Sequence, residues 1–280
     1  MPRASEKFIL NMPFLSPPLP EQRKIAAFLD GECGKIDVLR GKVEKQIAVL
    51  EEYRKSVITE AVTKGIKRGR KMKPSGERWC PEIPEGWMRV NAKSLFKLRT
   101  QRAQGGDKQL TASQQHGIIL QEEFMRVENQ RVVTVEKDFG ILKHVEPGDF
   151  VISMRSFQGG LEYSELRGCI SSAYIMLIPH PTKVFPPFYK WFFKSSKYIN
   201  AIQSTSNLVR DGQAMRYANF AQVPLFEIPI SEQREIAAYL DRKCAAIDSM
   251  VGKCREELDR LAEYKKSLIY EYVTGKKEVA

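Results

Sequence analysis

The stretch PLPEQRKIAAFLDGECGKID, residues 18–37, occurs a second time as PISEQREIAAYLDRKCAAID, residues 229–248. The two copies keep a constant separation of 211 residues, which pairs Glu21 with Glu232 and Cys33 with Cys244. The match continues without a gap, so that about 45 residues are duplicated in register. A long unrelated segment lies between the copies, which excludes a solenoid of short repeats. Two equivalent elements therefore flank a different one.

Each copy predicts a helix hairpin with unequal arms, which in the first copy are a helix over 20–30 and a long helix over 33–63. Apolar residues recur every seven positions in the long arm, as the seam of a coiled coil requires. In the first copy the seam is Ile36, Val43, Leu50 and Val57 with Leu39, Ile47 and Tyr53 between them, and in the second it is Ile247, Cys254, Leu261 and Leu268 with Met250, Leu258 and Tyr264. We expect the two long helices to pair as an antiparallel coiled coil that also serves as a spacer. Two core helices of a bundle are the alternative.

The segment between the copies has shorter apolar runs, many aromatic residues, and glycine and proline punctuation. Strands are expected over 130–136, 149–154 and 169–178, and a helix over 185–203. Within that helix, Trp191, Phe192, Phe193 and Tyr198 have helical spacing, which favours a core face over a surface for stacking bases. The sequence therefore predicts an α+β fold, with one globular domain and two long-helix regions.

Charge and composition restrict the class of protein. Lysine and arginine number 45 against 34 acidic residues, a net charge of +11, which makes nucleic acid the first partner to consider. A basic surface without such a partner explains the charge equally well. The sequence has no 18-residue apolar run and no signal-peptide pattern, so we expect a cytoplasmic protein without a membrane segment. The five cysteines and three histidines are scattered, so neither disulfides nor a metal site is expected.

Two further segments bear on the domain organisation. Residues 63–79 hold a basic run, which fits either a grip on phosphates or a solvated linker: Lys64, Lys67, Arg68, Arg70, Lys71 and Lys73. Residues 8–22, FILNMPFLSPPLPEQ, align at the same separation with residues 219–233, NFAQVPLFEIPISEQ. The expected order is a remnant of a first globular domain (1–17), a first helical repeat (18–64), a basic linker (65–83), a globular domain (84–228), a second helical repeat (229–275) and a tail (276–280).

Over essentially its whole length the chain resembles the specificity subunits of type I restriction-modification systems. The resemblance rests on both copies of the repeated motif, on EIPEGW (82–87), on KHVEPGDFVISMRSFQGGLEYSELRGCISSAYIML (143–177) and on MRYANFAQVPLFEIP (215–229). It implies target-recognition domains, each followed by a helical region that forms the spacer and docks methyltransferase subunits. It also implies a motor-nuclease subunit in the full complex. The chain departs from that pattern because its first target-recognition domain is absent apart from residues 1–17.

This departure leaves two functional alternatives. In the first, the chain reads one half of a bipartite target in double-stranded DNA, and pairs with a second copy or with another specificity subunit. Identical copies would then read a palindromic target. In the second, the chain is a truncated or silent-cassette subunit that docks its partners without productive DNA recognition.

Catalysis is not expected of this chain. An adenine methyltransferase would need a glycine-rich cofactor loop and an Asn/Asp-Pro-Pro-aromatic motif to hold the flipped base. A motor would need the phosphate-cradling pattern GxxxxGK[ST]. Neither pattern occurs in the sequence, so we expect no enzyme activity and no cofactor.

Direct base reading needs arginine, asparagine or glutamine on loops that can enter a groove, and three segments qualify: 99–109, 153–160 and 204–216. The candidates are Arg99, Gln101, Arg102, Lys108, Arg155, Ser156, Gln158, Asn207, Arg210, Gln213 and Arg216. For each of them, contact with solvent or phosphate alone is the alternative. The EQR triplet is identical in the two copies and cannot read different bases. We therefore assign Glu21, Gln22, Arg23, Glu232, Gln233 and Arg234 to hairpin packing and to the methyltransferase interface.

Overall fold

The computed structural model describes residues 7–8, 11, 16–113, 116–132, 134–135, 139–153, 161–205 and 217–279. The chain divides into two compact units, a helical unit (Met1–Glu52 with Ala246–Ala280) and a globular unit (Tyr53–Ala245). The boundaries lie inside the predicted helical repeats, because each long helix contributes residues to both units. Most of residues 1–17 lies outside the described ranges. Among the described helices, none combines the length and the apolarity that crossing a bilayer requires.

Two long helices, α2 (Leu19–Lys64) and α8 (Ile230–Val273), stand where the sequence predicted helix hairpins. The predicted break inside each copy is wrong. No proline follows Pro20 within α2, and a glycine such as Gly31 costs a helix only about 1 kcal/mol. Pro20 lies in the first turn, where its missing N–H is not needed. Gly65 follows the last residue of the helix and caps it in the left-handed conformation, with a φ of +74°. Its backbone N–H donates a hydrogen bond to the Ala61 carbonyl at 3.0 Å.

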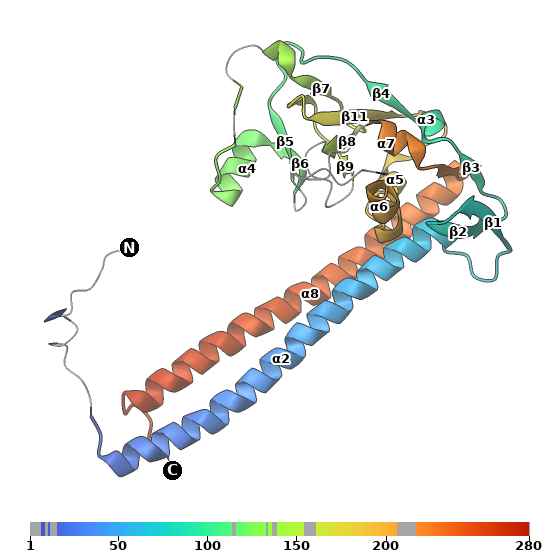
Figure 1. The fold of residues 1–280 in the computed structure, drawn as a ribbon. Coiled ribbons are helices and arrows are strands. Elements are labelled where there is room, and N and C mark those ends of the chain that lie inside the picture. Colours follow the sequence, from blue (N-terminus) through green and yellow to red (C-terminus); the bar gives the residue numbers. More distant parts are fainter. Residues whose placement is uncertain are drawn as a thin grey trace. The chain divides into compact units, whose positions relative to one another are not determined.

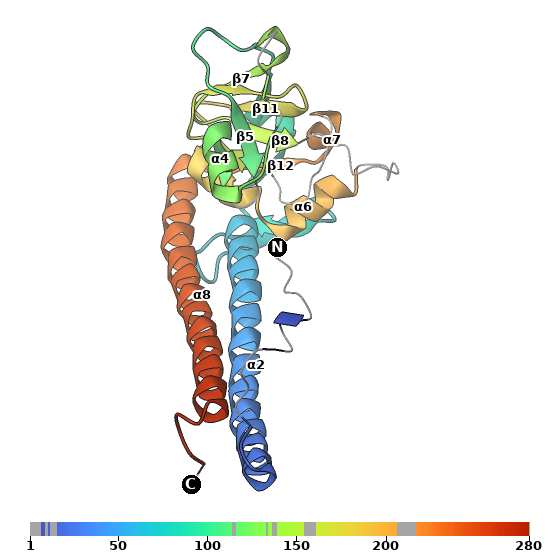
Figure 2. The same ribbon diagram turned by 90° about the vertical axis from the view of Figure 1, so that its left-hand side faces the viewer.

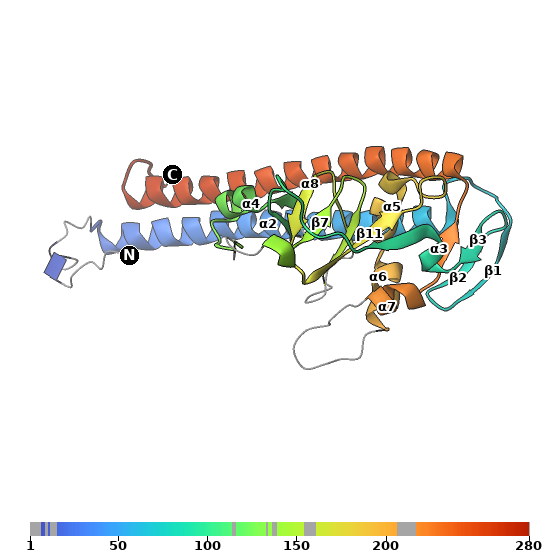
Figure 3. The same cartoon turned by 90° about the horizontal axis from the view of Figure 1, so that it is seen from above.

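Within the helical unit, α2 and α8 lie side by side, as the views of Figures 1 and 3 agree. Their contacts show that they run antiparallel, because the partners descend along α8 as the residues ascend along α2. These contacts join the rings of Phe28 and Tyr272 at 4.5 Å, Lys265 Nζ and Asp37 at 2.7 Å, and Arg255 Nη2 and Glu51 Oε1 at 3.3 Å.

The seven-residue pattern in these helices is only half correct. The residues spaced every seven positions are confirmed as seam residues where their side chains are buried, at Ile36, Val43, Val57, Ile247, Cys254 and Leu268. The residues predicted to lie between them in the seam are wrong at Leu39, Tyr53, Met250 and Tyr264, which are exposed. A single pair of helices covers only a narrow stripe of each partner, and Val251 is buried in place of its neighbour Met250. Apolar side chains are therefore left on the outer surface of the helical unit.

The globular unit is built around an antiparallel sheet. Among the described residues its strands follow the order β4 (Phe96–Arg99), β11 (Tyr174–Pro179), β8 (Phe150–Ser153) and β9 (Glu162–Tyr163). Further antiparallel pairs join β1 (Met72–Glu77) to β2 (Cys80–Pro84), β3 (Met88–Val90) to β12 (Leu225–Glu227), β5 (Leu110–Ser113) to β6 (Gly117–Leu120), and β7 (Lys143–Val145) to β10 (Gly168–Ile170). Part of the segment predicted as a linker thus forms the β1–β2 hairpin.

Short helices and an aromatic core complete the globular unit. The helical elements are α3 (Ala92–Leu95), α4 (Gln121–Glu128), the 3-10 turn η1 (Phe139–Ile141), α5 (Pro186–Phe192), α6 (Ser196–Gln203) and α7 (Tyr217–Gln222). Figure 2 shows α4 beside β5. Phe192, Phe193 and Tyr198 are fully buried, which confirms the predicted core face, and Trp191 packs at its edge.

Three of the four elements predicted for the middle segment differ from the structure. The strand over 149–154 is confirmed as β8. The strand over 130–136 is wrong, because the described residues of that range are irregular and Gln109 holds the Val135 backbone through two hydrogen bonds. The strand over 169–178 is two strands, since a turn closes where the Tyr174 amide donates to the Ser171 carbonyl. The helix over 185–203 is likewise split into α5 and α6.

Candidate nucleic-acid interface

The loop 100–109 joins β4 to β5 and carries several of the predicted DNA-reading residues. Its backbone is fastened to β7, to β10 and to Leu142, the residue before β7, by three hydrogen bonds. They join the Ala103 amide to the Leu142 carbonyl at 3.1 Å, the His144 amide to the Gln101 carbonyl at 3.1 Å, and the Cys169 amide to the Lys108 carbonyl at 2.9 Å. The side chains of Gln101, Arg102 and Lys108 are exposed on this fixed backbone. The loop therefore presents polar groups without itself being loosely held.

Arg99, at the end of β4, is engaged inside the domain. Its Nε and Nη2 donate to the two carboxylate oxygens of Asp149 at 2.6 and 2.8 Å, and its Nη1 donates to Gln101 Oε1 at 2.5 Å. The two partners of the ion pair are only 11% and 2% exposed. A guanidinium held bidentately by a buried carboxylate cannot also fork onto a guanine without breaking that pair. This geometry favours a structural role, and we leave Arg99 out of the proposed interface.

Arg102 has a different environment. It is exposed, and its Nη1 donates to the Ile141 carbonyl at 3.1 Å. Burial lowers the pKa of the adjacent Lys143, and the positive charge of Arg102 lowers it further. Lys143 Nζ donates to the Tyr174 carbonyl at 2.6 Å. Two cations thus lie close together beside loop 100–109, an arrangement that an approaching phosphate would stabilise.

The other two predicted DNA-reading segments adjoin described elements. Ser153, the first residue of one segment, ends β8, and the next described strand is β9. The second segment connects α6 to α7. The candidates in these segments lie outside the described residues and stay predictions: Arg155, Ser156, Gln158, Asn207, Arg210, Gln213 and Arg216.

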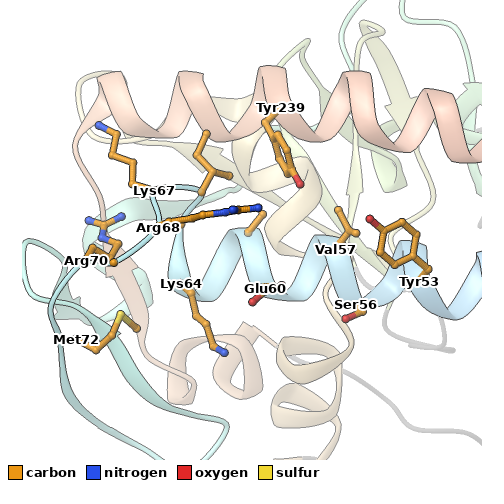
Figure 4. Close-up of a pocket in the computed structure, with 14 residues that line it drawn as sticks. Tyr53, Ser56, Val57, Glu60, Lys64, Lys67, Arg68, Arg70, Met72 and Tyr239 are labelled. Atoms are coloured by element: carbon orange, nitrogen blue, oxygen red, sulfur yellow. The ribbon is translucent and has the colours of Figure 1, made fainter.

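The basic segment after α2 surrounds a cavity of about 490 Å³, shown in Figure 4. Lys67 Nζ lies 3.3 Å from Glu235 Oε2, and Arg70 forms an ion pair with Glu232 and lies over the Trp87 ring. Figure 4 shows Arg68 extending between α2 and α8 below the ring of Tyr239. Part of the charge that suggested a phosphate grip is therefore neutralised by carboxylates of α8.

The second copy of the repeated motif is an internal anchor of the globular unit. Gln233 is fully buried, and its amide group donates to the carbonyls of Lys183 and Ile228 and accepts from the Phe185 amide, at 2.7–2.8 Å. Glu232 accepts a hydrogen bond from Trp87 Nε1 at 3.0 Å. Only Arg234 of this triplet is exposed, where it lies over the Phe185 ring. Glu232 and Gln233 thus contact residues of the globular unit, and their burial there does not favour a role in a partner interface.

The first copy of the same motif has the opposite environment. Glu21, Gln22 and Arg23 are all exposed, and Gln22 Nε2 donates to the nearby Pro17 carbonyl at 2.7 Å. The apolar residues behave in the same way. Ile236, Ala237 and Leu240 are buried in the core, whereas their equivalents Ile25, Ala26 and Leu29 are half-buried or exposed. A surface that binds a globular unit in one copy is therefore uncovered in the other.

A buried polar cluster that was not predicted from the sequence lies beneath loop 100–109. Both ring nitrogens of His144 lie 2.7 Å from a carboxylate oxygen, Nδ1 from Asp107 and Nε2 from Glu146. Asp107 also accepts from the Gln104 amide at 2.7 Å, within the loop. The segment KHVEPGD (143–149) contained the signal, because it places a histidine and two carboxylates within one turn-forming stretch. Across the described ranges, groups of histidine, cysteine and carboxylate side chains that could hold a metal ion were not found.

Comparison with curated proteins identifies relatives of one kind. The chain is 26% identical over 268 residues to a protein of Methanocaldococcus jannaschii provisionally named the specificity subunit of the type I restriction enzyme MjaX, a match over 93% of this chain and 58% of that protein. It is 32% identical over 100 residues to the MjaVIII type I specificity subunit of the same organism, a match over 36% of this chain and 22% of that protein. The chain thus spans little more than half the length of the first relative. No family model matches it.

Solved structures share the fold. A chain from a structural study of assembly and conformational transition in the type I R-M system matches 92% of this chain with a TM-score of 0.63 and 16% identity, over 60% of its own length. The HsdS subunit from Thermoanaerobacter tengcongensis matches 99% of this chain with a TM-score of 0.51 and 16% identity, over 64% of its own length. At this level of identity the likeness concerns the mixed helix and sheet fold with its long C-terminal helix.

Proposed function

Because the chain is a relative of the specificity subunits of type I restriction enzymes, we propose that its globular unit reads one half of a bipartite target in double-stranded DNA. The observation that carries this proposal is loop 100–109, whose fixed backbone displays Gln101, Arg102 and Lys108. Arginine pairs bidentately with guanine and glutamine with adenine in the major groove. The net charge of +11 supplies the sequence-independent attraction to phosphates. The segments 153–160 and 204–216, which carry the other candidates, would add the remaining contacts.

The proposal assigns catalysis to other subunits. We infer that the paired helices form an antiparallel coiled coil that sets the distance to the other half-site and docks methyltransferase subunits, with a motor-nuclease subunit joining the full complex. Exposed apolar residues of the helical unit, Leu39, Met250 and Tyr264, support this docking role. Because the repeat makes Leu39 equivalent to Met250, the two helices offer similar surfaces to two copies of one partner.

The test of this function is selection followed by methylation mapping. We expect the full chain, purified with its methyltransferase, to enrich particular duplexes from a random pool. Cells that carry both genes should show adenine methylation at a bipartite target that disappears when this gene is deleted. If two identical copies act together, that target is palindromic. An asymmetric target would contradict the identical pair, and enrichment of no sequence would contradict DNA recognition itself.

A second candidate function follows from the length of the chain, which matches only 58% of the first relative. In this candidate the chain docks methyltransferase subunits without productive recognition. Retention of the methyltransferase on immobilised chain, together with equal binding of all duplexes, would favour it over the first.

The uncovered copy of the repeated motif supports pairing with a second recognition unit. In α8, Ala237 is buried against the globular core, whereas its equivalent Ala26 is exposed on α2. A second globular unit of the same kind matches this surface, supplied by another specificity subunit or by a second copy. Because a globular unit already docked on its own α8 has this face covered, identical copies would pair here by exchanging units.

We expect Ala26→Glu to weaken self-association of the chain at least tenfold, because a buried unpaired charge costs several kcal/mol at an interface. Light scattering after size exclusion measures the effect, with the 32.1 kDa protomer as reference. Ala48→Glu is the matched control, since Ala48 and its repeat equivalent Asp259 are both exposed. Equal behaviour of the two variants would exclude this surface from pairing.

A further inference from the structure

His144 lies beneath the DNA-reading loop, and the proposed function does not use it. The side chain is 0% exposed and belongs to β7, the strand to which the loop backbone is fastened. One of its contacts, Asp107, lies within the loop, and the other, Glu146, lies in the turn that follows β7. The imidazole thus links the loop to the scaffold through side chains, beside the backbone bonds already described.

Both contacts of the imidazole require a donor on the ring. Carboxylates accept hydrogen bonds but do not donate them when ionised, and a neutral imidazole carries one N–H only. At 2.7 Å from Asp107 Oδ2 and 2.7 Å from Glu146 Oε1, the ring can donate to both only as an imidazolium. A neutral ring would turn a nitrogen lone pair toward one of the carboxylates. The geometry therefore selects the charged form.

The surrounding charges determine how firmly the proton is held. Burial alone lowers the pKa of His144, but hydrogen bonds to Glu146 and Asp107 and their negative charges raise it more, so that it lies above its ordinary value of 6.5. The hydrogen bond from His144 lowers the pKa of Glu146, helped by the charges of Arg167 and Arg99.

The neighbouring side chains complete this environment. Arg167 Nε lies 3.8 Å from both Asp107 Oδ1 and Glu146 Oε1. Cys169 Sγ lies 3.8 Å from the Asp107 carbonyl oxygen. The Asp149 carboxylate accepts a hydrogen bond from the Glu146 backbone amide and forms an ion pair with Arg99. Each carboxylate near the ring therefore has a cationic neighbour, and among the described residues the groups that contact the ring nitrogens are the two anions.

We propose that protonated His144 is a positioning residue that holds loop 100–109 in its DNA-reading conformation, so that sequence-selective binding weakens when the imidazole loses its proton. This inference rests on the proposed function of the loop. Deprotonation removes one of the two N–H donors and leaves either Asp107 or Glu146 facing a nitrogen lone pair. Where that carboxylate is Asp107, the loop loses its side-chain link to the scaffold. The loop then remains tied by its backbone bonds, but its display of Gln101, Arg102 and Lys108 is no longer fixed from beneath.

The sign of the pH dependence follows from the raised pKa of His144. A group whose pKa is higher in the folded state stabilises the fold fully below its unfolded value, here 6.5. That contribution is lost as the pH rises through the higher folded value. We therefore expect the loop to be best ordered near pH 6 and to loosen at alkaline pH. Most carboxylate-dependent effects run in the opposite direction, because they weaken as the pH falls.

The experiment uses the full chain with its methyltransferase and one duplex enriched from a random pool, with a scrambled duplex of the same composition beside it. Between pH 6 and pH 9 we expect affinity for the enriched duplex to fall roughly tenfold beyond the fall seen with the scrambled duplex, as expected for one lost charge-assisted bond. His144→Gln should bind more weakly at pH 6 and show no such selective fall. His116→Gln is the matched control and should keep the wild-type profile.

A second measurement separates failure of this inference from failure of the proposed function. Nitrogen-15 NMR of the free chain should show both His144 ring nitrogens protonated at pH 6, and the amides of Ala103 and Cys169 should titrate with the ring. A neutral ring at pH 6, or a wild-type binding profile as flat as that of His144→Gln, overturns the positioning role. If the ring is doubly protonated and its titration shifts those amide signals, but the chain enriches no duplex, the positioning role of His144 is supported and DNA reading is overturned instead.

Discussion

Replacing Ile236 with alanine should lower the free energy of unfolding of the globular unit by about 3 kcal/mol, whereas Ile25→Ala should change it by less than about 0.5 kcal/mol. The two isoleucines occupy the same position of the repeated motif. Ile236 is fully buried in the core, and removing its side chain leaves a cavity. Ile25 is half-buried on the helical unit, so its loss cannot open a cavity in the globular core.

The three tryptophans make this comparison selective, because Trp79, Trp87 and Trp191 all belong to the globular unit. Urea unfolding followed by tryptophan fluorescence therefore reports on that unit. Equal losses in the two variants would show that the two copies of the motif have equivalent environments, contrary to the structure.

The second large effect concerns Arg99. Arg99→Ala should destabilise the globular unit by about 3 kcal/mol or more, because it leaves Asp149 buried and without its cation. The same unfolding measurement detects this loss. Any fall in DNA binding by this variant would accompany unfolding and would disappear in comparisons made per folded molecule.

Arg102→Ala is the matched control for Arg99→Ala, because both residues are arginines adjoining loop 100–109 and only one forms a buried ion pair. We expect Arg102→Ala to change the unfolding free energy by about 0.5 kcal/mol at most. Its affinity for an enriched duplex should nevertheless fall about tenfold or more, as for an arginine that reads a base. Loss of stability in Arg102→Ala with unchanged binding would reverse the roles that we assign to the two residues.

Local patterns in the sequence were sufficient to predict that both copies of the repeated motif are helical and that Phe192, Phe193 and Tyr198 belong to the core. The burial of Ile36 and Ile247 could be predicted because a heptad is a property of one helix and is visible without knowledge of its partner. The same pattern failed at Leu39 and Met250, because burial there depends on how many helices surround the pair. The break predicted within each long helix failed for another reason, since a glycine lowers helix stability by too little to end a helix that packing supports.

The roles of the candidate site residues depended on contacts between distant positions. Arg99 and Asp149 are fifty residues apart, and nothing near Arg99 in the sequence distinguishes it from Arg102. Gln22 and Gln233 have identical neighbours, yet only Gln233 is buried. The difference between them is the presence of a globular unit against one copy, which is a property of the fold and not of the motif.

The pairing of β3 with β12 has a consequence for biosynthesis. Val90 lies opposite Leu225, so a strand made early is completed by one made 135 residues later. At about 5–20 residues per second, a ribosome needs on the order of ten seconds to make the intervening chain. Throughout that interval β3 has no native partner strand within the nascent polypeptide. Folding of the globular unit is therefore a late, long-range event, and the interval before it is the time at which chaperones have most to protect.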